Sequence, residues 1–91
     1  MISNVSRKTR IENRLNDLFD PIKLLVRDDS EAHAGHAQVD KDAKETHFYI
    51  NLVSKSFQGM NRIEMHKKIY SILNDEFNSG LHALELNISS E

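Results

Sequence analysis

The chain has 91 residues, 38% of them hydrophobic and 29% charged, and it contains no cysteine. This length suits one domain with one core and leaves little room for a deep substrate pocket, and the composition is typical of a folded protein. The net charge of −2 argues against tight nonspecific binding to nucleic acid, and the lack of cysteine excludes disulfides and thiolate ligands. No apolar run resembles a membrane span or a signal peptide, so the sequence predicts a cytoplasmic protein without a membrane role.

The first predicted element is a helix, because apolar residues recur at helical spacing and form one stripe. The stripe consists of Ile11, Leu15, Leu18 and Phe19. Ser6 is suited to cap the start of this helix, and Pro21 is expected to end it, because the residue before proline avoids helical geometry. A strand over Ile22–Arg27 is predicted next, from the alternation of Ile22, Leu24 and Val26.

The segment from Asp28 to Glu45 contains almost no large apolar residue, which predicts a flexible loop over about residues 28–45. Loops of this length are uncommon in compact domains and often have a function. A second strand is predicted over Thr46–Val53, and a turn over Ser54–Met60. The strand directs one set of alternate residues to the core, namely Phe48, Ile50 and Leu52.

A second long helix is predicted to begin near Arg62, because Asn61 and Glu64 have the spacing of a capping box. Gly80 is expected to end it as a left-handed cap residue. The expected buried stripe of this helix is Ile63, Ile69, Tyr70, Leu73 and Phe77. In the last predicted strand, Leu81–Ile88, alternation places on the core-facing side His82, Leu84, Leu86 and Ile88.

These elements predict an α+β fold in one domain of residues 1–91, with a core over about 7–88. The expected order is helix, strand, strand, helix, strand, with one extra helical turn after Gly59. The helical connection before the last strand allows it to lie parallel to the second. The result is a three-stranded mixed sheet with helices packed on one face.

The histidines are the residues best suited to chemistry, and His82 is the most informative by position. It is either a half-buried packing histidine or a metal ligand held at the rim of the sheet. His33 and His36 in the long loop are spaced to hold one metal ion, or are simply solvated. His47 is expected to point away from the core as a surface or cross-strand residue, and His66 to pack on the helix. No catalytic motif is present, so a binding module is favoured over an enzyme.

From about Arg10 to Ile88 the chain resembles the BolA family. The stretches that carry the resemblance are Asp28-Asp29-Ser30 with His33-Ala34-Gly35-His36-Ala37, Glu45-Thr46-His47-Phe48, Val53-Ser54 with Phe57-Gln58-Gly59, Met65-His66-Lys67-Lys68-Ile69-Tyr70, and Leu81-His82-Ala83-Leu84. The family usually has arginine where this chain has Met65, and often at Lys67, so the basic character of the helix is weaker here. The resemblance implies an αββααβ fold similar to class II KH domains.

The resemblance also implies a partner, a monothiol glutaredoxin with a Cys-Gly-Phe-Ser active site, and a shared [2Fe-2S] cluster. The glutaredoxin and glutathione would each supply a thiolate, and this chain would supply His82 with either His33 or His36; no cofactor is expected in the isolated chain. Imidazoles can replace thiolates on one iron of such a cluster. The implied role is iron–sulfur cluster trafficking or iron and redox regulation.

The alternative implied function is transcriptional regulation through weak binding of double-stranded DNA. The residues expected to contact phosphates come from the predicted turn and the second helix: Lys55, Arg62, Lys67 and Lys68.

Overall fold

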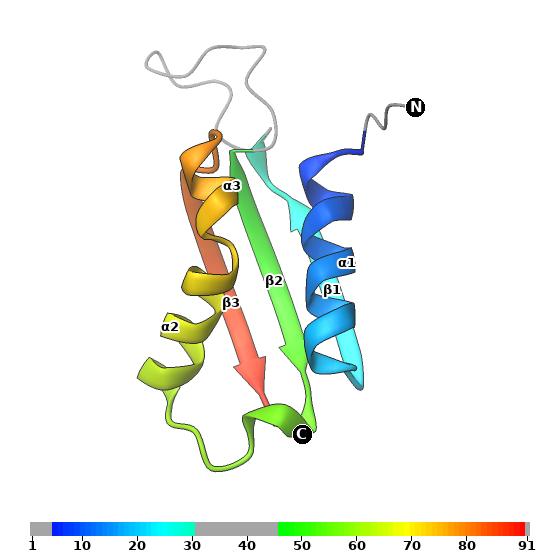
Figure 1. Cartoon of the computed structure of the whole chain (residues 1–91), viewed down its shortest axis with the longest axis vertical. Helices are drawn as coiled ribbons and strands as arrows, with labels where there is room; N and C mark the ends of the chain where they lie inside the picture. The colour runs from blue at the N-terminus through cyan, green and yellow to red at the C-terminus, as the bar shows by residue number, and fades with distance from the viewer. Residues whose placement is uncertain (1–4, 31–45, 91) are drawn as a thin grey trace.

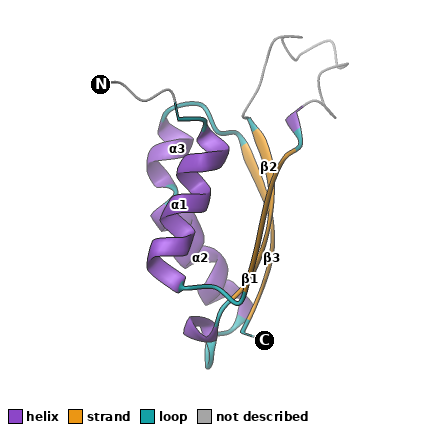
Figure 2. Cartoon of the chain, turned by 90° about the vertical axis from the view of Figure 1, so that its right-hand side faces the viewer, coloured by secondary structure: helices purple, strands orange, loops and turns teal. Residues whose placement is uncertain are grey.

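The computed structural model describes residues 5–30 and 46–90, and these form one sheet covered by helices on one side. The elements in chain order are α1 (Arg7–Phe19), β1 (Lys23–Asp28), β2 (His47–Val53), the 3-10 turn η2 (Lys55–Phe57), α2 (Arg62–Ile72), α3 (Asn74–Asn78) and β3 (Ala83–Ser89). The sheet order is β1-β2-β3, with β1 antiparallel and β3 parallel to β2 (Figure 1). The helices lie on one face and leave the other face open (Figure 2), which confirms the predicted α+β architecture.

Side-chain hydrogen bonds fix the residues at which α1 and α2 begin. The Ser6 hydroxyl accepts a hydrogen bond from the Thr9 N–H at 3.1 Å, which satisfies a donor at the start of α1. Asn61 and Glu64 form both bonds of the capping box, at 2.8 and 2.9 Å, so α2 begins at the predicted residue. The extra helical turn, η2, precedes Gly59 instead of following it, because the Ser54 hydroxyl caps the turn.

The long second helix is divided into α2 and α3 at Leu73, whose φ of −96° and ψ of 14° depart from helical values. Ile69 and Leu73 are buried as predicted, but Ile63 is 66% exposed and Tyr70 is 41% exposed. At about 100° per residue, these two side chains lie on a different side of the helix from Met65, Ile69 and Leu73. The buried stripe of α2 is therefore narrower than predicted.

The first helix also buries a narrower stripe than predicted. Arg7, Ile11, Leu15 and Phe19 are buried, whereas Leu18 is 54% exposed. The buried positions form one row spaced by four residues, which is inclined to the helix axis. Leu18 lies outside this row, and Ile22, which precedes β1, is likewise exposed.

Ser54 joins the end of α1 to the end of β2, and its side chain is buried. Its hydroxyl donates to the Phe19 carbonyl at 2.6 Å and accepts from the Ser56 N–H. Ser54→Ala leaves both groups unpaired and is expected to lower the free energy of unfolding by about 1–3 kcal/mol, measured by urea denaturation. Ser71→Ala on the exposed side of α2 is the control, and an equal effect of both variants would contradict the assigned role.

Candidate functional site at the His82 end of the sheet

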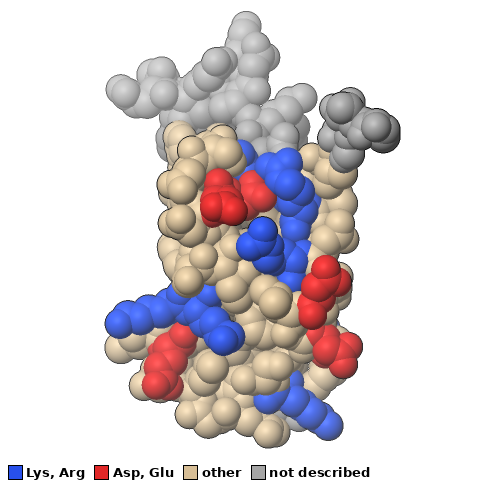
Figure 3. Space-filling view, viewed as in Figure 1, with Lys and Arg blue, Asp and Glu red and all other residues tan. Residues whose placement is uncertain are grey.

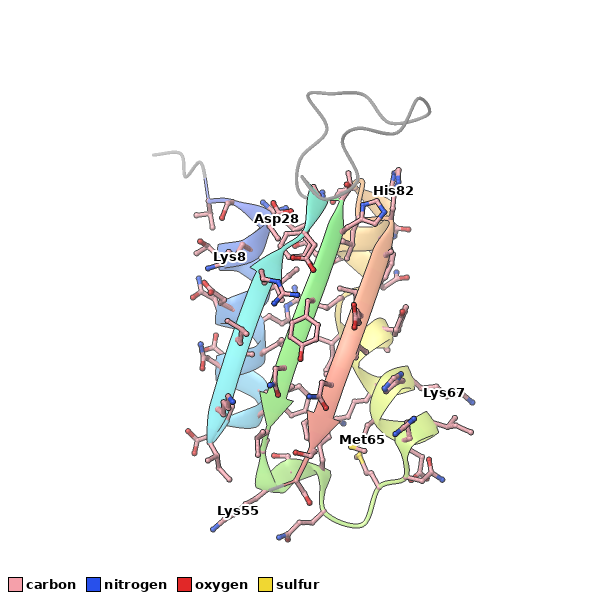
Figure 4. The ribbon with its side chains drawn as sticks, turned by 180° about the vertical axis from the view of Figure 1, so that it is seen from behind. Lys8, Asp28, Lys55, Met65, Lys67 and His82 are labelled. Atoms are coloured by element: carbon pink, nitrogen blue, oxygen red, sulfur yellow. The ribbon has the colours of Figure 1, made fainter. Side chains whose placement is uncertain are left out.

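The starts of β2 and β3 meet at one end of the sheet because these two strands are parallel. Their register pairs His47 with Ala83. The Thr46 carbonyl accepts two hydrogen bonds, from the backbone N–H groups of His82 at 2.8 Å and Ala83 at 3.1 Å. The backbone of His82 is therefore fixed at the rim of the sheet (Figure 4).

The His82 side chain is exposed, which corrects the prediction that it faces the core. β3 begins at Ala83, two residues later than predicted, and Leu81 is buried where alternation with Leu84 would bury His82. Gly80 takes a φ of +130°, so the backbone turns just before Leu81 and alternation does not extend back to His82. The structure therefore leaves the imidazole accessible instead of packing it into the core.

His47 was predicted as a surface or cross-strand residue, and it lies beside His82, a pairing that was not predicted. The two ring centroids are 6.1 Å apart with an interplanar angle of 62°. His47 is half-buried, and its Nδ1 lies 2.9 Å from the Thr46 hydroxyl. Parallel pairing of the second and third strands was the signal that would have brought Thr46-His47 next to His82-Ala83.

Hydrogen bonds through Ser30 connect the C-terminal end of β1 to Thr46, at the same end of the sheet. Ser30 is buried, donates its hydroxyl proton to Asp28, and accepts a hydrogen bond from the Thr46 N–H at 3.0 Å. Asp29 binds Arg27 through two hydrogen bonds, and this carboxylate raises the pKa of Arg27. Because Ser30 and Thr46 are in contact, the segment between them starts and ends close to His82.

The two predicted loop ligands, His33 and His36, lie outside the described residues. Within residues 5–30 and 46–90, no group of three or more histidine, aspartate or glutamate side chains is placed to hold a metal ion. The described chain therefore offers imidazole donors at this end, chiefly from His82, and any thiolate must come from another molecule because the sequence has no cysteine.

The predicted phosphate-contacting residues are all exposed: Lys55, Arg62, Lys67 and Lys68. Lys55 and Lys67 lie away from the His82 end of the sheet (Figure 4). On the helix-covered face basic and acidic side chains are interspersed instead of forming one basic surface (Figure 3). Met65 packs against the core, which accounts for an apolar side chain at that position.

A cleft of about 450 Å³ separates α1 from α2 and α3. Both arginines that line it make hydrogen bonds across the cleft: Arg10 binds Glu76, and Arg14 donates to the Ile72 carbonyl at 3.0 Å. His66 is half-buried and lines a second cleft beside β3. No described helix is long and apolar enough to cross a membrane.

Comparisons of sequence and of structure both match this chain to BolA-like proteins. The family model described as BolA-like protein matches residues 15–91. The chain is 46% identical over 84 residues to SufE-like protein 1, chloroplastic/mitochondrial, of Arabidopsis thaliana, which covers 89% of this chain and 23% of that protein. It is 37% identical to the UV-induced protein uvi31 of Schizosaccharomyces pombe, over 93% of this chain and 85% of that protein.

A further relative is named DNA-binding transcriptional regulator BolA, from Escherichia coli, at 38% identity over 87% of this chain and 70% of that protein. Among solved structures, the BolA domain of SufE1 from Arabidopsis thaliana matches with a TM-score of 0.84 and 41% identity, covering 97% of this chain and 95% of that one. The chain spans 23% of the length of SufE-like protein 1 and 51% of the length of another relative, Protein BOLA1, chloroplastic, of Arabidopsis thaliana. The chain belongs to the BolA-like protein family.

Proposed function

We propose that this chain is a non-enzymatic adaptor that binds a monothiol glutaredoxin and shares a [2Fe-2S] cluster with it, using His82 as one ligand. The observation that supports this most directly is the exposed His82 imidazole on a backbone fixed by the Thr46 carbonyl. A ligand whose backbone is already fixed loses little conformational entropy when it binds a metal centre, and solvent exposure lets a partner reach it.

The donor set fits one half of such a cluster. Two imidazoles can coordinate one iron of a [2Fe-2S] centre, and two thiolates the other. This chain has imidazoles and no thiolate, so the thiolates would come from the glutaredoxin cysteine and from glutathione. His33 or His36 remains the proposed second ligand, because the segment that contains them joins Ser30 to Thr46 beside His82.

The test is to mix the chain with a cluster-loaded Cys-Gly-Phe-Ser glutaredoxin and to follow visible absorption and circular dichroism. Exchange of a thiolate for an imidazole at iron is expected to change the spectrum, and size-exclusion chromatography is expected to show a heterodimer. An unchanged spectrum together with separate elution of the two proteins would rule out the proposal. Glutaredoxin without a cluster is the control for nonspecific association.

A second candidate function, DNA binding, is favoured by the names of relatives such as the Escherichia coli regulator and by the exposed lysines of α2. Lys67→Gln/Lys68→Gln is expected to weaken binding to duplex DNA and to reduce its salt dependence by roughly two counterions, measured by fluorescence anisotropy. Lys8→Gln, an exposed lysine on α1, is the matched control. Equal salt dependence for the wild type and the double variant would exclude a role for this part of α2.

A further inference from the structure

We propose that His47 and His82 form a paired-imidazole site for a single divalent transition-metal ion on the isolated chain. This site does not require a glutaredoxin, so it goes beyond the function proposed above. Imidazole is a good ligand for Zn²⁺, Cu²⁺ and Ni²⁺. His47 is the first residue of β2, and His82 immediately precedes β3 beside it.

The spacing of the two rings suits one ion. With metal–nitrogen bonds of about 2.0–2.1 Å, two imidazoles on one tetrahedral ion have ring centroids about 5 Å apart. The observed centroid distance is 6.1 Å. The His82 side chain is exposed, so core packing does not prevent its χ angles from changing to shorten this distance.

Thr46 orders both halves of the site. Its hydroxyl lies 2.9 Å from Nδ1 of His47, and its carbonyl accepts the backbone N–H groups of His82 and Ala83. A hydrogen bond to the non-ligating nitrogen fixes the orientation of a metal-binding histidine, and loss of such a bond typically weakens metal binding about 10- to 100-fold. Thr46 is therefore a positioning residue for the pair.

The described surroundings of the pair are polar. A small cleft of about 190 Å³ is lined by Asp29, His47 and Glu85, with Ala83 and Leu84 at its base. Asp29 is already bound to Arg27, so the Glu85 carboxylate is the acidic group that makes these surroundings favourable for a cation. Water would complete the coordination, because the described residues supply no third side-chain ligand in place.

The experiment titrates ZnCl₂ into the tag-free full chain, followed by isothermal calorimetry and by ¹H–¹⁵N spectra. One equivalent of Zn²⁺ is expected to bind, with the largest shifts at Thr46, His47, His82 and Ala83. His47→Gln and His82→Gln are each expected to lower the affinity at least about tenfold, and Thr46→Val about tenfold. His66→Gln, which removes a half-buried histidine on α2, is the matched control and is expected to bind zinc as the wild type does.

Three results would overturn the site: no saturable binding at millimolar zinc, unchanged affinity in His47→Gln, or loss of binding in His33→Gln/His36→Gln while His47→Gln still binds. Modification of histidines by diethyl pyrocarbonate tests the site in the wild-type chain, without any substitution. Zinc is expected to protect His47 and His82 but not His66, and equal modification with and without zinc would contradict the pair. Because no glutaredoxin is present, failure here leaves the cluster proposal untouched, and failure of cluster sharing leaves this site untouched.

Discussion

Replacing His82 by alanine is expected to abolish most of the spectral change that a cluster-loaded glutaredoxin undergoes on mixing with this chain. The imidazole is exposed at the start of β3 and makes no core contact that its removal would disturb. The variant should therefore fold normally while losing a direct iron ligand. Visible circular dichroism measures the ligand exchange, and we expect the apparent affinity for the cluster-loaded partner to fall at least about tenfold.

His66→Ala is the matched control for this experiment, since it removes a histidine from α2 at a distance from the His82 end of the sheet. It is expected to behave as the wild type. His33→Ala and His36→Ala then separate the two loop candidates, because only the true second ligand should reproduce part of the His82→Ala effect. A normal spectrum in His82→Ala would exclude this residue as a ligand even if the heterodimer forms.

Glu76→Gln is expected to have the largest effect on stability among the charged residues, about 2–3 kcal/mol of unfolding free energy. Arg7 and Arg10 both bind this carboxylate, each with Nε at 2.8 Å. The Arg7 side chain is only 9% exposed and also donates to Ser79. A glutamine keeps only one acceptor oxygen, removes the negative charge between the two guanidinium groups, and turns an amide N–H toward one of them.

The same cluster predicts how stability depends on pH. Hydrogen bonding to Arg10, then to Arg7, lowers the pKa of Glu76 from its ordinary value of 4.5 in the folded protein. The folded state therefore binds a proton less readily than the unfolded state. The contribution of Glu76 is fully present above the ordinary value and is lost as the pH falls through the lowered one. Urea denaturation should show the difference between wild type and Glu76→Gln shrinking below pH 4.5.

Glu12→Gln provides the control for both measurements. Glu12 pairs with Lys8 at 2.8 Å, four residues away on the surface of α1, where both side chains are at least one-third exposed. Such pairs contribute little, and we expect a change below about 0.5 kcal/mol. If Glu76→Gln is no more destabilising than Glu12→Gln, the ion cluster of Arg7, Arg10 and Glu76 does not stabilise the packing of α1 against α3.

Much of the fold was predictable because its signals are local. The Ser6 cap, the capping box of Asn61 and Glu64, and the alternation of Phe48, Ile50 and Leu52 each depend on residues a few positions apart. These signals located α1, β2 and the start of α2 to within a residue or two, but not the division of the second helix at Leu73. The parallel pairing of the last two strands was also predicted, because the helical connection between them allows it, and the structure confirms it.

The exposure of each predicted core position was less predictable, because it depends on where an element meets its neighbours. Leu18, Ile63 and Tyr70 all have helical spacing, yet they are exposed. The pairing of Arg7 with Glu76 had no sequence signal at all, since these residues are 69 positions apart and meet only when α1 and α3 pack.

For the site, the sequence by itself determined that any chemistry rests on histidines and that thiolates must come from elsewhere, because it contains no cysteine. Only the tertiary structure decided that His82 faces solvent and that His47 stands beside it. Both facts follow from the turn at Gly80 and from the register of β2 with β3. Alternation describes a strand only from its first paired residue, and the position of that residue is fixed by a neighbouring strand far away in the sequence.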